Sequence, residues 1–187
     1  MTKFRPIPDG AIAIDLPNTS QLRGYTCGPS ALMSVLAFHG VGPEHERELA
    51  IAMGIDRTGA DPRHVVRALR RYGLAFEEFR PMATTQLTAC LDRSRPVMIT
   101  LQAWGGRANA GYAKRRDSGH WIVAIGHDSE GVYFEDPYLY RTRGFLTFDE
   151  LAERWHDVEG TRRRPLDRYG IAIWRDAPRI RRARAIE

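Results

Sequence analysis

Hydrophobic positions follow two different patterns along the chain, and the change lies near residue 74. Before it, apolar residues recur with helical spacing, and the longest run follows Cys27 and ends before Gly40. Pro29 fits the first turn of such a helix, where a missing N–H costs little, and glycine is common just after a helix end. Because the residues between them are apolar on nearly all sides, we expect a buried helix.

Further elements are expected on both sides of this helix. Residues 11–16 alternate in polarity and predict a strand, which a proline ends. A second helix is expected over residues 43–53, and a third follows a proline at its start and ends before Gly73. The third helix would turn its valines and leucine inward and its arginines outward.

The second half of the chain has the shorter apolar runs that predict strands. These runs lie at residues 74–79, 96–101, 120–126, 131–136, 145–148 and 169–174. Short helices are expected at residues 85–93 and 149–155, and a long loop rich in glycine and basic residues at 102–119. Because helices come first and an antiparallel sheet follows, the order predicts an α+β protein.

The composition is that of one globular domain. Of the 187 residues, 43% are hydrophobic and 27% charged, which are ordinary values for a soluble protein. We expect a single domain over residues 1–187, with 1–10 an extended arm and 176–187 a basic tail. Because no apolar run approaches the roughly 18–20 residues of a membrane span, and the N-terminus lacks a signal-peptide core, we expect a cytoplasmic protein without a membrane partner.

The net charge of +5 comes mostly from arginine, with clusters at residues 162–164 and 175–184. A basic tail can bind nucleic acid or an acidic partner. However, no aromatic residues interleave with the terminal arginines and no nucleic-acid motif accompanies them, so a solvated end is favoured. Without a Cys-x-x-Cys motif or paired histidines, neither a metal nor another cofactor is expected. The sequence gives no indication of an oligomeric state.

Cys27 is the first candidate for chemistry. It stands at the predicted N-terminus of the buried helix, where the helix dipole and unpaired N–H groups favour a thiolate. A buried structural cysteine is the alternative interpretation. Cys90 lies on one face of a short predicted helix, and we expect a packed, inert thiol there. Two cysteines are too few for a disulfide scaffold, and a bridge between them would silence the nucleophile.

His120 is the candidate base for this thiol. It precedes a buried strand, whereas the other five histidines are expected at surface or capping positions. The turn of the predicted hairpin centres near residues 128–129, so His120 falls opposite residues 136–138. Asp136 is then a direct or diagonal cross-strand neighbour on the same face, where it can accept a hydrogen bond from the imidazole. A turn residue before Pro137 is the alternative interpretation of Asp136.

Gln21 adds a donor. Its side-chain amide, six residues before Cys27, could hold a developing oxyanion together with the Cys27 backbone N–H, although a surface loop residue is the simpler alternative. With Gln21, residues 27–30, 119–123 and 135–137, the chain resembles the C39-like peptidases of the papain-like cysteine peptidase superfamily. The resemblance covers roughly residues 12–174.

This resemblance implies a papain-like fold, in which an N-terminal helical lobe packs on a C-terminal antiparallel β-sheet lobe with a cleft between them. It implies Cys27 as nucleophile, His120 as general base and acid, Asp136 as the residue that orients His120, and Gln21 as oxyanion donor. Around these, we expect Trp104, Gly119 and Trp121 to bind substrate.

The expected function is hydrolysis of a peptide or amide bond through an acyl-thioester on Cys27, with a peptide or protein as partner. The same residues could support acyl transfer or deamidation, or the site could be a non-catalytic peptide-binding module. The best-known C39 members are attached to exporters and remove leader peptides. The 187 residues contain no exporter segment, so we do not expect leader peptides as the substrate. Stand-alone secreted relatives begin with a leader, which is not seen here.

Overall fold

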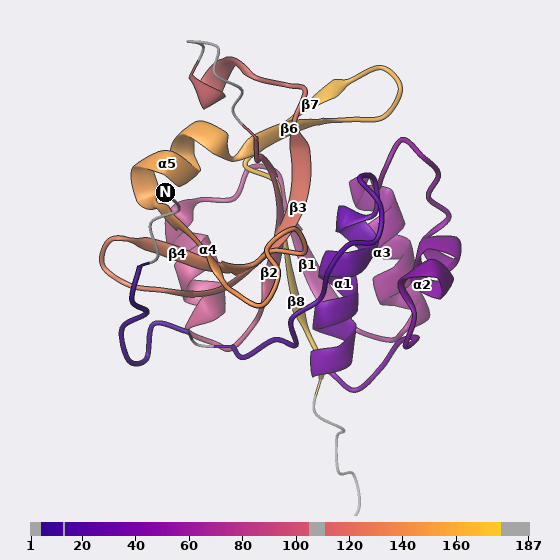
Figure 1. The fold of residues 1–187 in the computed structure, drawn as a ribbon, viewed down its shortest axis with the longest axis horizontal. Helices are drawn as coiled ribbons and strands as arrows, with labels where there is room; N and C mark the ends of the chain where they lie inside the picture. Colours follow the sequence, from indigo (N-terminus) through magenta and orange to yellow (C-terminus); the bar gives the residue numbers. More distant parts are fainter. Residues whose placement is uncertain (1–4, 13, 105–110, 177–187) are drawn as a thin grey trace, which may run out of the picture.

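The computed structural model describes residues 5–12, 14–104 and 111–176. Figure 1 shows helices from the first part of the chain on one side and a sheet with further helices on the other. We call the first group the helical lobe, and it consists of α1 (Cys27–Phe38), α2 (Glu46–Met53) and α3 (Pro62–Arg71). The rest forms the sheet lobe.

The sheet lobe is built on six antiparallel strands in the order β1-β8-β2-β3-β4-β5. The strands are β1 (Ala75–Phe79), β2 (Val97–Gln102), β3 (Gly119–His127), β4 (Gly131–Glu135), β5 (Gly144–Thr147) and β8 (Gly170–Trp174). Two helices, α4 (Thr84–Leu91) and α5 (Phe148–Arg154), belong to the same lobe. Helices followed by an antiparallel sheet confirm the α+β class.

The contact between α1 and β3 joins the two lobes. Helix α1 begins at Cys27, is buried along most of its length, and is followed by Gly40 in the left-handed region with φ 67°. β3 lies between β2 and β4 and is buried at all but its end residues. A Cβ on Gly28 would meet the Trp121 indole at 3.3 Å, so a glycine there lets the start of α1 approach β3 closely.

The strand expected over residues 11–16 is wrong. Among its described residues, this segment pairs with the sheet through an isolated bridge from Ile12 to Gly126 and a hydrogen bond from the Ile14 N–H to the Ile125 carbonyl, and it forms no strand. The segment forms no strand because β3 has little of its edge left unpaired. Its pairing with β2 ends at Ala124, and its other edge is occupied by β4. Only a short stretch of β3 is therefore open to the N-terminal segment.

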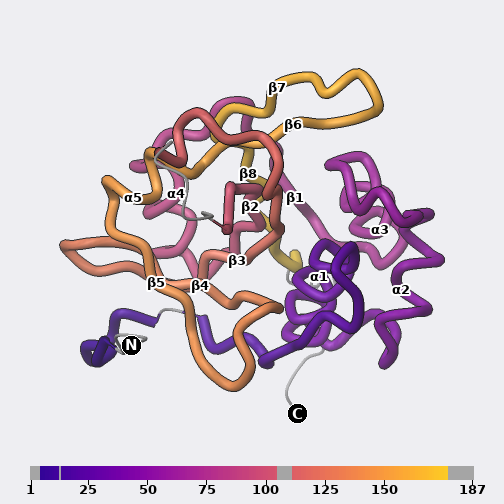
Figure 2. The backbone as a smooth tube through the Cα atoms, turned by 45° about the horizontal axis from the view of Figure 1, so that its top comes forward, coloured from indigo at the N-terminus to yellow at the C-terminus, as the bar shows by residue number. Residues whose placement is uncertain are grey.

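A two-stranded sheet was missed. It consists of β6 (His156–Glu159) and β7 (Arg164–Asp167), which pair as an antiparallel hairpin. In Figures 1 and 2 this hairpin extends from the sheet lobe toward α3, and the Gly160 N–H donates to the Asp61 carboxylate at 3.0 Å. The two strands consist mostly of polar and charged residues and include a proline, so their pattern lacks the alternation that predicts a strand.

The expected arm, loop and tail are described only in part. Within residues 1–10, Arg5 binds the β3–β4 turn through Asp128 and Glu130. Within the loop at 102–119, residues 112–114 form a 3-10 helix, while 105–110 lie outside the described residues, as does most of the tail at 176–187. No helix in the described part of the chain combines the length and hydropathy that a membrane span requires.

Candidate active site

Cys27 is the first residue of α1, as the sequence predicts, and its side chain is buried with 8% of its surface exposed. The turn before it is held by Thr26, whose hydroxyl donates to the Arg23 carbonyl at 3.0 Å and accepts from the Arg23 N–H at 3.1 Å. N–H groups in the first turn of a helix have no intrahelical acceptor. The thiol therefore sits where unpaired donors and the positive end of the helix dipole meet.

His120 and Asp136 meet at the other side of the α1–β3 contact. The His120 Nε2 lies 2.7 Å from the Asp136 Oδ1, and the imidazole is 1% exposed. β3 and β4 pair with Val123 opposite Glu135, so Asp136 is the diagonal neighbour that residue counting predicts. The same Oδ1 accepts the Tyr138 N–H at 2.8 Å, which holds the carboxylate in place.

The second ring nitrogen of His120 is left for the thiol. Nδ1 is buried and has no hydrogen-bond partner among the described residues. Cys27 is a close neighbour of the ring. Burial lowers the pKa of His120, but the hydrogen bond to Asp136 and the contact with Cys27 outweigh it and raise the pKa to about 9. At neutral pH the ring is therefore an imidazolium.

Aromatic rings cover this pair. Trp104, expected to bind substrate, packs on His120 with ring centroids 4.8 Å apart, and Tyr138 packs against Trp104 at 5.2 Å. Trp104 and Tyr138 both remain well exposed. The two rings cover His120 and limit the access of water to the His120–Asp136 hydrogen bond. The lower local dielectric strengthens the electrostatic attraction within this hydrogen bond.

Gln21 lies at the edge of the site. Its backbone N–H donates to the Pro137 carbonyl at 2.9 Å, next to Asp136. Its side-chain Nε2 donates one hydrogen to the Arg23 carbonyl at 3.0 Å, and the second hydrogen of the same nitrogen remains for a substrate. The structure thus brings Gln21 close to the His120–Asp136 pair, with its amide turned partly toward its own loop.

A buried carboxylate that sequence reasoning missed holds this loop. Glu135 is fully buried and accepts from the Asn18 side chain and the Thr19 N–H, both at 2.9 Å. Arg143 forms an ion pair with Glu135 and also donates to the Leu16 carbonyl at 2.6 Å. The signal that could have found it is a single carboxylate at the end of the apolar strand β4, since a buried charge requires partners.

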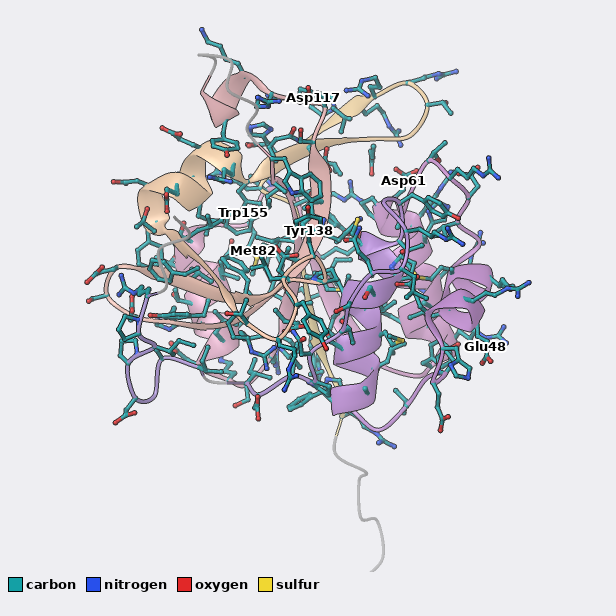
Figure 3. The ribbon with its side chains drawn as sticks, in the orientation of Figure 1. Glu48, Asp61, Met82, Asp117, Tyr138 and Trp155 are labelled. Carbon is teal, nitrogen blue, oxygen red and sulfur yellow. The ribbon has the colours of Figure 1, made fainter. Side chains whose placement is uncertain are left out.

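Cys27 opens into a cavity of about 320 Å³ between the two lobes, and Gly119 and Trp121 also line it. Trp121 is buried with 3% of its surface exposed, and its indole N–H donates to the Ala60 carbonyl at 2.7 Å. Figure 3 labels Asp61 and Asp117, which line the cavity from the helical lobe and the sheet lobe. We call this cavity the groove.

We expect iodoacetamide at neutral pH to alkylate Cys27 at least about 10-fold faster than Cys90. Both thiols are equally little exposed, at 8%, so access does not favour either. Cys27 lies beside the His120 imidazolium, whose positive charge favours a thiolate, whereas burial raises the pKa of Cys90. Mass spectrometry of tryptic peptides over time gives both rates in one sample. Equal rates, or faster alkylation of Cys90, would contradict the assignment of Cys27 as the reactive thiol.

Comparison with known proteins agrees with this arrangement. A model of the Peptidase_C39 like family matches residues 13–161 of the chain. No curated protein matches the sequence.

Solved structures of several peptidases share the fold. A protein described as a C39-like peptidase from Bacillus anthracis superposes with a TM-score of 0.66 at 14% identity, over 89% of this chain and 98% of that one. The peptidase domain of Streptococcus ComA, a bifunctional ABC transporter of a quorum-sensing pathway, gives 0.64 at 16% identity over 87% and 100%. A double glycine motif protease from an AMS/PCAT transporter, solved with its leader peptide, gives 0.58 at 17% over 88% and 94%. The papain-like fold expected from the sequence is thereby confirmed.

Proposed function

The chain belongs to the C39-like peptidase family, and from this premise we propose that it hydrolyses a peptide bond through an acyl-thioester on Cys27. The observation that carries the proposal is a series of contacts, from Cys27 at the start of α1 to His120 on β3, and from His120 to Asp136 just after β4. Of these three residues, Cys27 lines the groove. A thiol, an imidazole and an oriented carboxylate in that order supply a nucleophile, a proton carrier and its support.

The first half-reaction forms the thioester. The Cys27 thiolate attacks the carbonyl carbon of the scissile bond, whose oxygen takes the displaced electron pair. The C–N bond then breaks, and the leaving nitrogen takes the proton from the His120 Nδ1, so an amine departs and the acyl group stays on sulfur. Since the pKa of His120 is raised to about 9, the proton needed for this step is in place at neutral pH.

The second half-reaction releases the acyl group. Neutral His120 takes a proton from water as the water oxygen attacks the thioester carbonyl. The C–S bond breaks, a carboxylic acid leaves, and the thiolate and imidazolium are restored. Asp136 holds the ring with Nδ1 toward Cys27 by engaging Nε2 at 2.7 Å, so one ring nitrogen serves both transfers.

The developing oxyanion in both steps needs donors. We assign this role to the Cys27 backbone N–H and to the second Nε2 hydrogen of Gln21. The Gln21 backbone bond to Pro137 and the Glu135 contacts to Asn18 and Thr19 support the placement of this loop beside the site. Removal of one such preorganised donor lowers the rate about 10²–10³-fold.

The substrate class that we propose is a peptide or an extended segment of a protein. The groove between the lobes, with Gly119 and Trp121 on its sheet side, supports an extended chain that passes Cys27. A protease of the same fold has been solved with a leader peptide, which supports peptide binding in general. Both cysteines are free thiols, as the reducing cytoplasm maintains them, and we place the reaction there.

Hydrolysis predicts a specific labelling result. In water enriched with oxygen-18, incubation with a peptide library will give shorter peptides whose new C-terminal carboxylate carries one heavy oxygen for each cleavage. Mass spectrometry measures this directly. Amine adducts in the presence of an added primary amine would indicate acyl transfer, and side-chain amides converted to acids without chain cleavage would indicate deamidation. An unchanged library, together with slow Cys27 alkylation, would indicate a non-catalytic binding module.

A further inference from the structure

A third carboxylate, besides those of Asp61 and Asp117, reaches the groove from the β6–β7 hairpin. Asp157 lies in β6, and its carboxylate lies against Gly119, the residue before His120. A Cβ on Gly119 would collide with both carboxylate oxygens of Asp157, so the absence of a side chain at 119 makes room for this group. Asp157 thus occupies the place of a side chain at position 119, in a groove that Cys27 also lines.

The Asp157 carboxylate is fixed in position by neutral donors. Gln102 is fully buried and donates from Nε2 to Asp157 Oδ1 at 3.2 Å. The Gln102 Oε1 accepts the Ser118 N–H at 3.0 Å, so one amide connects the carboxylate to the start of β3. The Val158 N–H is a further donor to Asp157. Within the described residues Asp157 forms no ion pair, whereas its neighbour Glu159 binds Arg80 and Arg164.

The other charged side chains that line the groove are Arg57, Asp61, Arg116, Asp117 and Arg163. Arg116 donates to the Ala113 carbonyl, and Arg163 to the Arg116 carbonyl. Asp61 accepts the Gly160 N–H, and Asp117 pairs with Arg115 at 3.4 Å. Next to Asp157 in β6, burial lowers the pKa of His156, so this ring is neutral at neutral pH.

The fold leaves the charge of Asp157 incompletely compensated. Burial raises its pKa to about 6, although the Val158 N–H, Gln102 and the more distant Arg163 and Arg116 act in the opposite direction. A raised pKa means that the folded state binds this proton more tightly than the unfolded state, so ionisation between about pH 4 and pH 6 lowers the free energy of unfolding. A buried carboxylate that costs stability and faces a groove is suited to a ligand.

We infer that Asp157 is a specificity-determining residue, which binds a cationic group of the substrate within about two residues of the scissile bond. The inference rests on the proposed function. The cationic group is an alkylammonium or guanidinium side chain or a free α-amino group, since either would supply the donor and positive charge that the neutral partners of Asp157 lack. The groove of about 320 Å³ extends from Cys27 to Asp157 and has room for such a side chain.

Peptidyl chloromethyl ketones test this inference, because Cys27 displaces their chloride in a single measurable alkylation. In the first pair of probes, both N-acetylated tripeptides, one member carries lysine at the two positions nearest the electrophile. The other member carries the neutral analogue norleucine at both positions. A second pair compares a free with an acetylated N-terminus. At pH 7.5 we expect the wild type to react about 10-fold faster with the cationic member of one pair, which identifies the source of the charge. At pH 5 this ratio falls toward one as Asp157 protonates, and effects on Cys27 itself cancel in the ratio.

Asp157→Asn is the matching variant, because an amide oxygen still accepts from Gln102 while the charge is lost. Asp117→Asn is the control, since it removes the same charge from an exposed position of the same groove. We expect a ratio near one in Asp157→Asn and the wild-type ratio in Asp117→Asn. An unchanged ratio in Asp157→Asn, or no preference for cations in the wild type at pH 7.5, overturns the inference about Asp157 and leaves the proposed function standing. Alkylation of Cys27 no faster than that of Cys90 by any probe overturns the proposed function as well.

Discussion

Replacing Cys27 with alanine will reduce peptide hydrolysis by at least about 1,000-fold and leave the fold intact. Cys27 carries the acyl group in the proposed mechanism, so the loss should approach that seen when a covalent nucleophile is removed from other hydrolases. The structural cost is small, because one sulfur atom is lost at the start of a helix whose other residues keep their packing. Turnover of a cleaved library peptide and thermal unfolding followed by circular dichroism measure the two effects.

Cys90→Ala is the matched control for this variant. It makes the same chemical change at the other thiol, which has the same 8% exposure and lies in α4. We expect wild-type turnover from it. If Cys27→Ala kept its activity, or if both variants lost it equally, covalent catalysis at Cys27 would be ruled out.

The contact between His120 and Asp136 could be predicted from the sequence because a short turn determines it. The residues between β3 and β4 set the register of the hairpin, and counting outward from them places Asp136 diagonal to His120. The distance of 2.7 Å confirms this contact, while the catalytic roles stay a proposal. The start of α1 at Cys27 was predictable for the same reason, since a proline in the first turn is a local signal.

The orientation of Gln21 could not be predicted, because residues far away in the sequence determine it. The loop that carries it is held by Glu135, which binds Asn18 and Thr19 across more than a hundred residues. No pattern near residue 21 contains that information. The sequence could suggest an amide donor near the thiol, but the direction of its N–H groups depends on packing between the lobes.

Asp157 was missed for a related reason. It lies in a hairpin whose strands are polar, so neither strand could be recognised by alternation. The contact that gives Asp157 a place in the groove depends on Gly119 having no side chain, and the sequence alone does not reveal what fills that space. For Trp121, in contrast, the sequence suggested substrate binding for a residue that is mostly buried. Its position next to His120 in β3 places most of the indole in the core.

Replacing His120 with asparagine will reduce turnover by at least about 1,000-fold and will slow the alkylation of Cys27. In the wild type the raised pKa of His120, about 9, keeps an imidazolium beside the thiolate across neutral pH. Turnover should therefore fall as the pH rises above about 9, where the leaving amine loses its proton donor. Without the imidazolium beside the thiol, alkylation of Cys27 by iodoacetamide at pH 7.5 should slow by at least about 10-fold, as mass spectrometry of tryptic peptides over time will measure.

Asp136→Asn separates the role of the imidazole from that of its support. The amide can still contact Nε2, but it lacks the negative charge that stabilises the imidazolium, so the pKa of His120 should fall toward its ordinary range. The upper limit of the pH profile should then move from about 9 toward neutrality, with a smaller loss of turnover than in His120→Asn. The hydrogen bond from the Tyr138 N–H to Asp136 can be kept by the amide oxygen, so the local fold should persist. If the pH profile of this variant matched that of the wild type, Asp136 would be a turn residue before Pro137 and no part of the proton-transfer system.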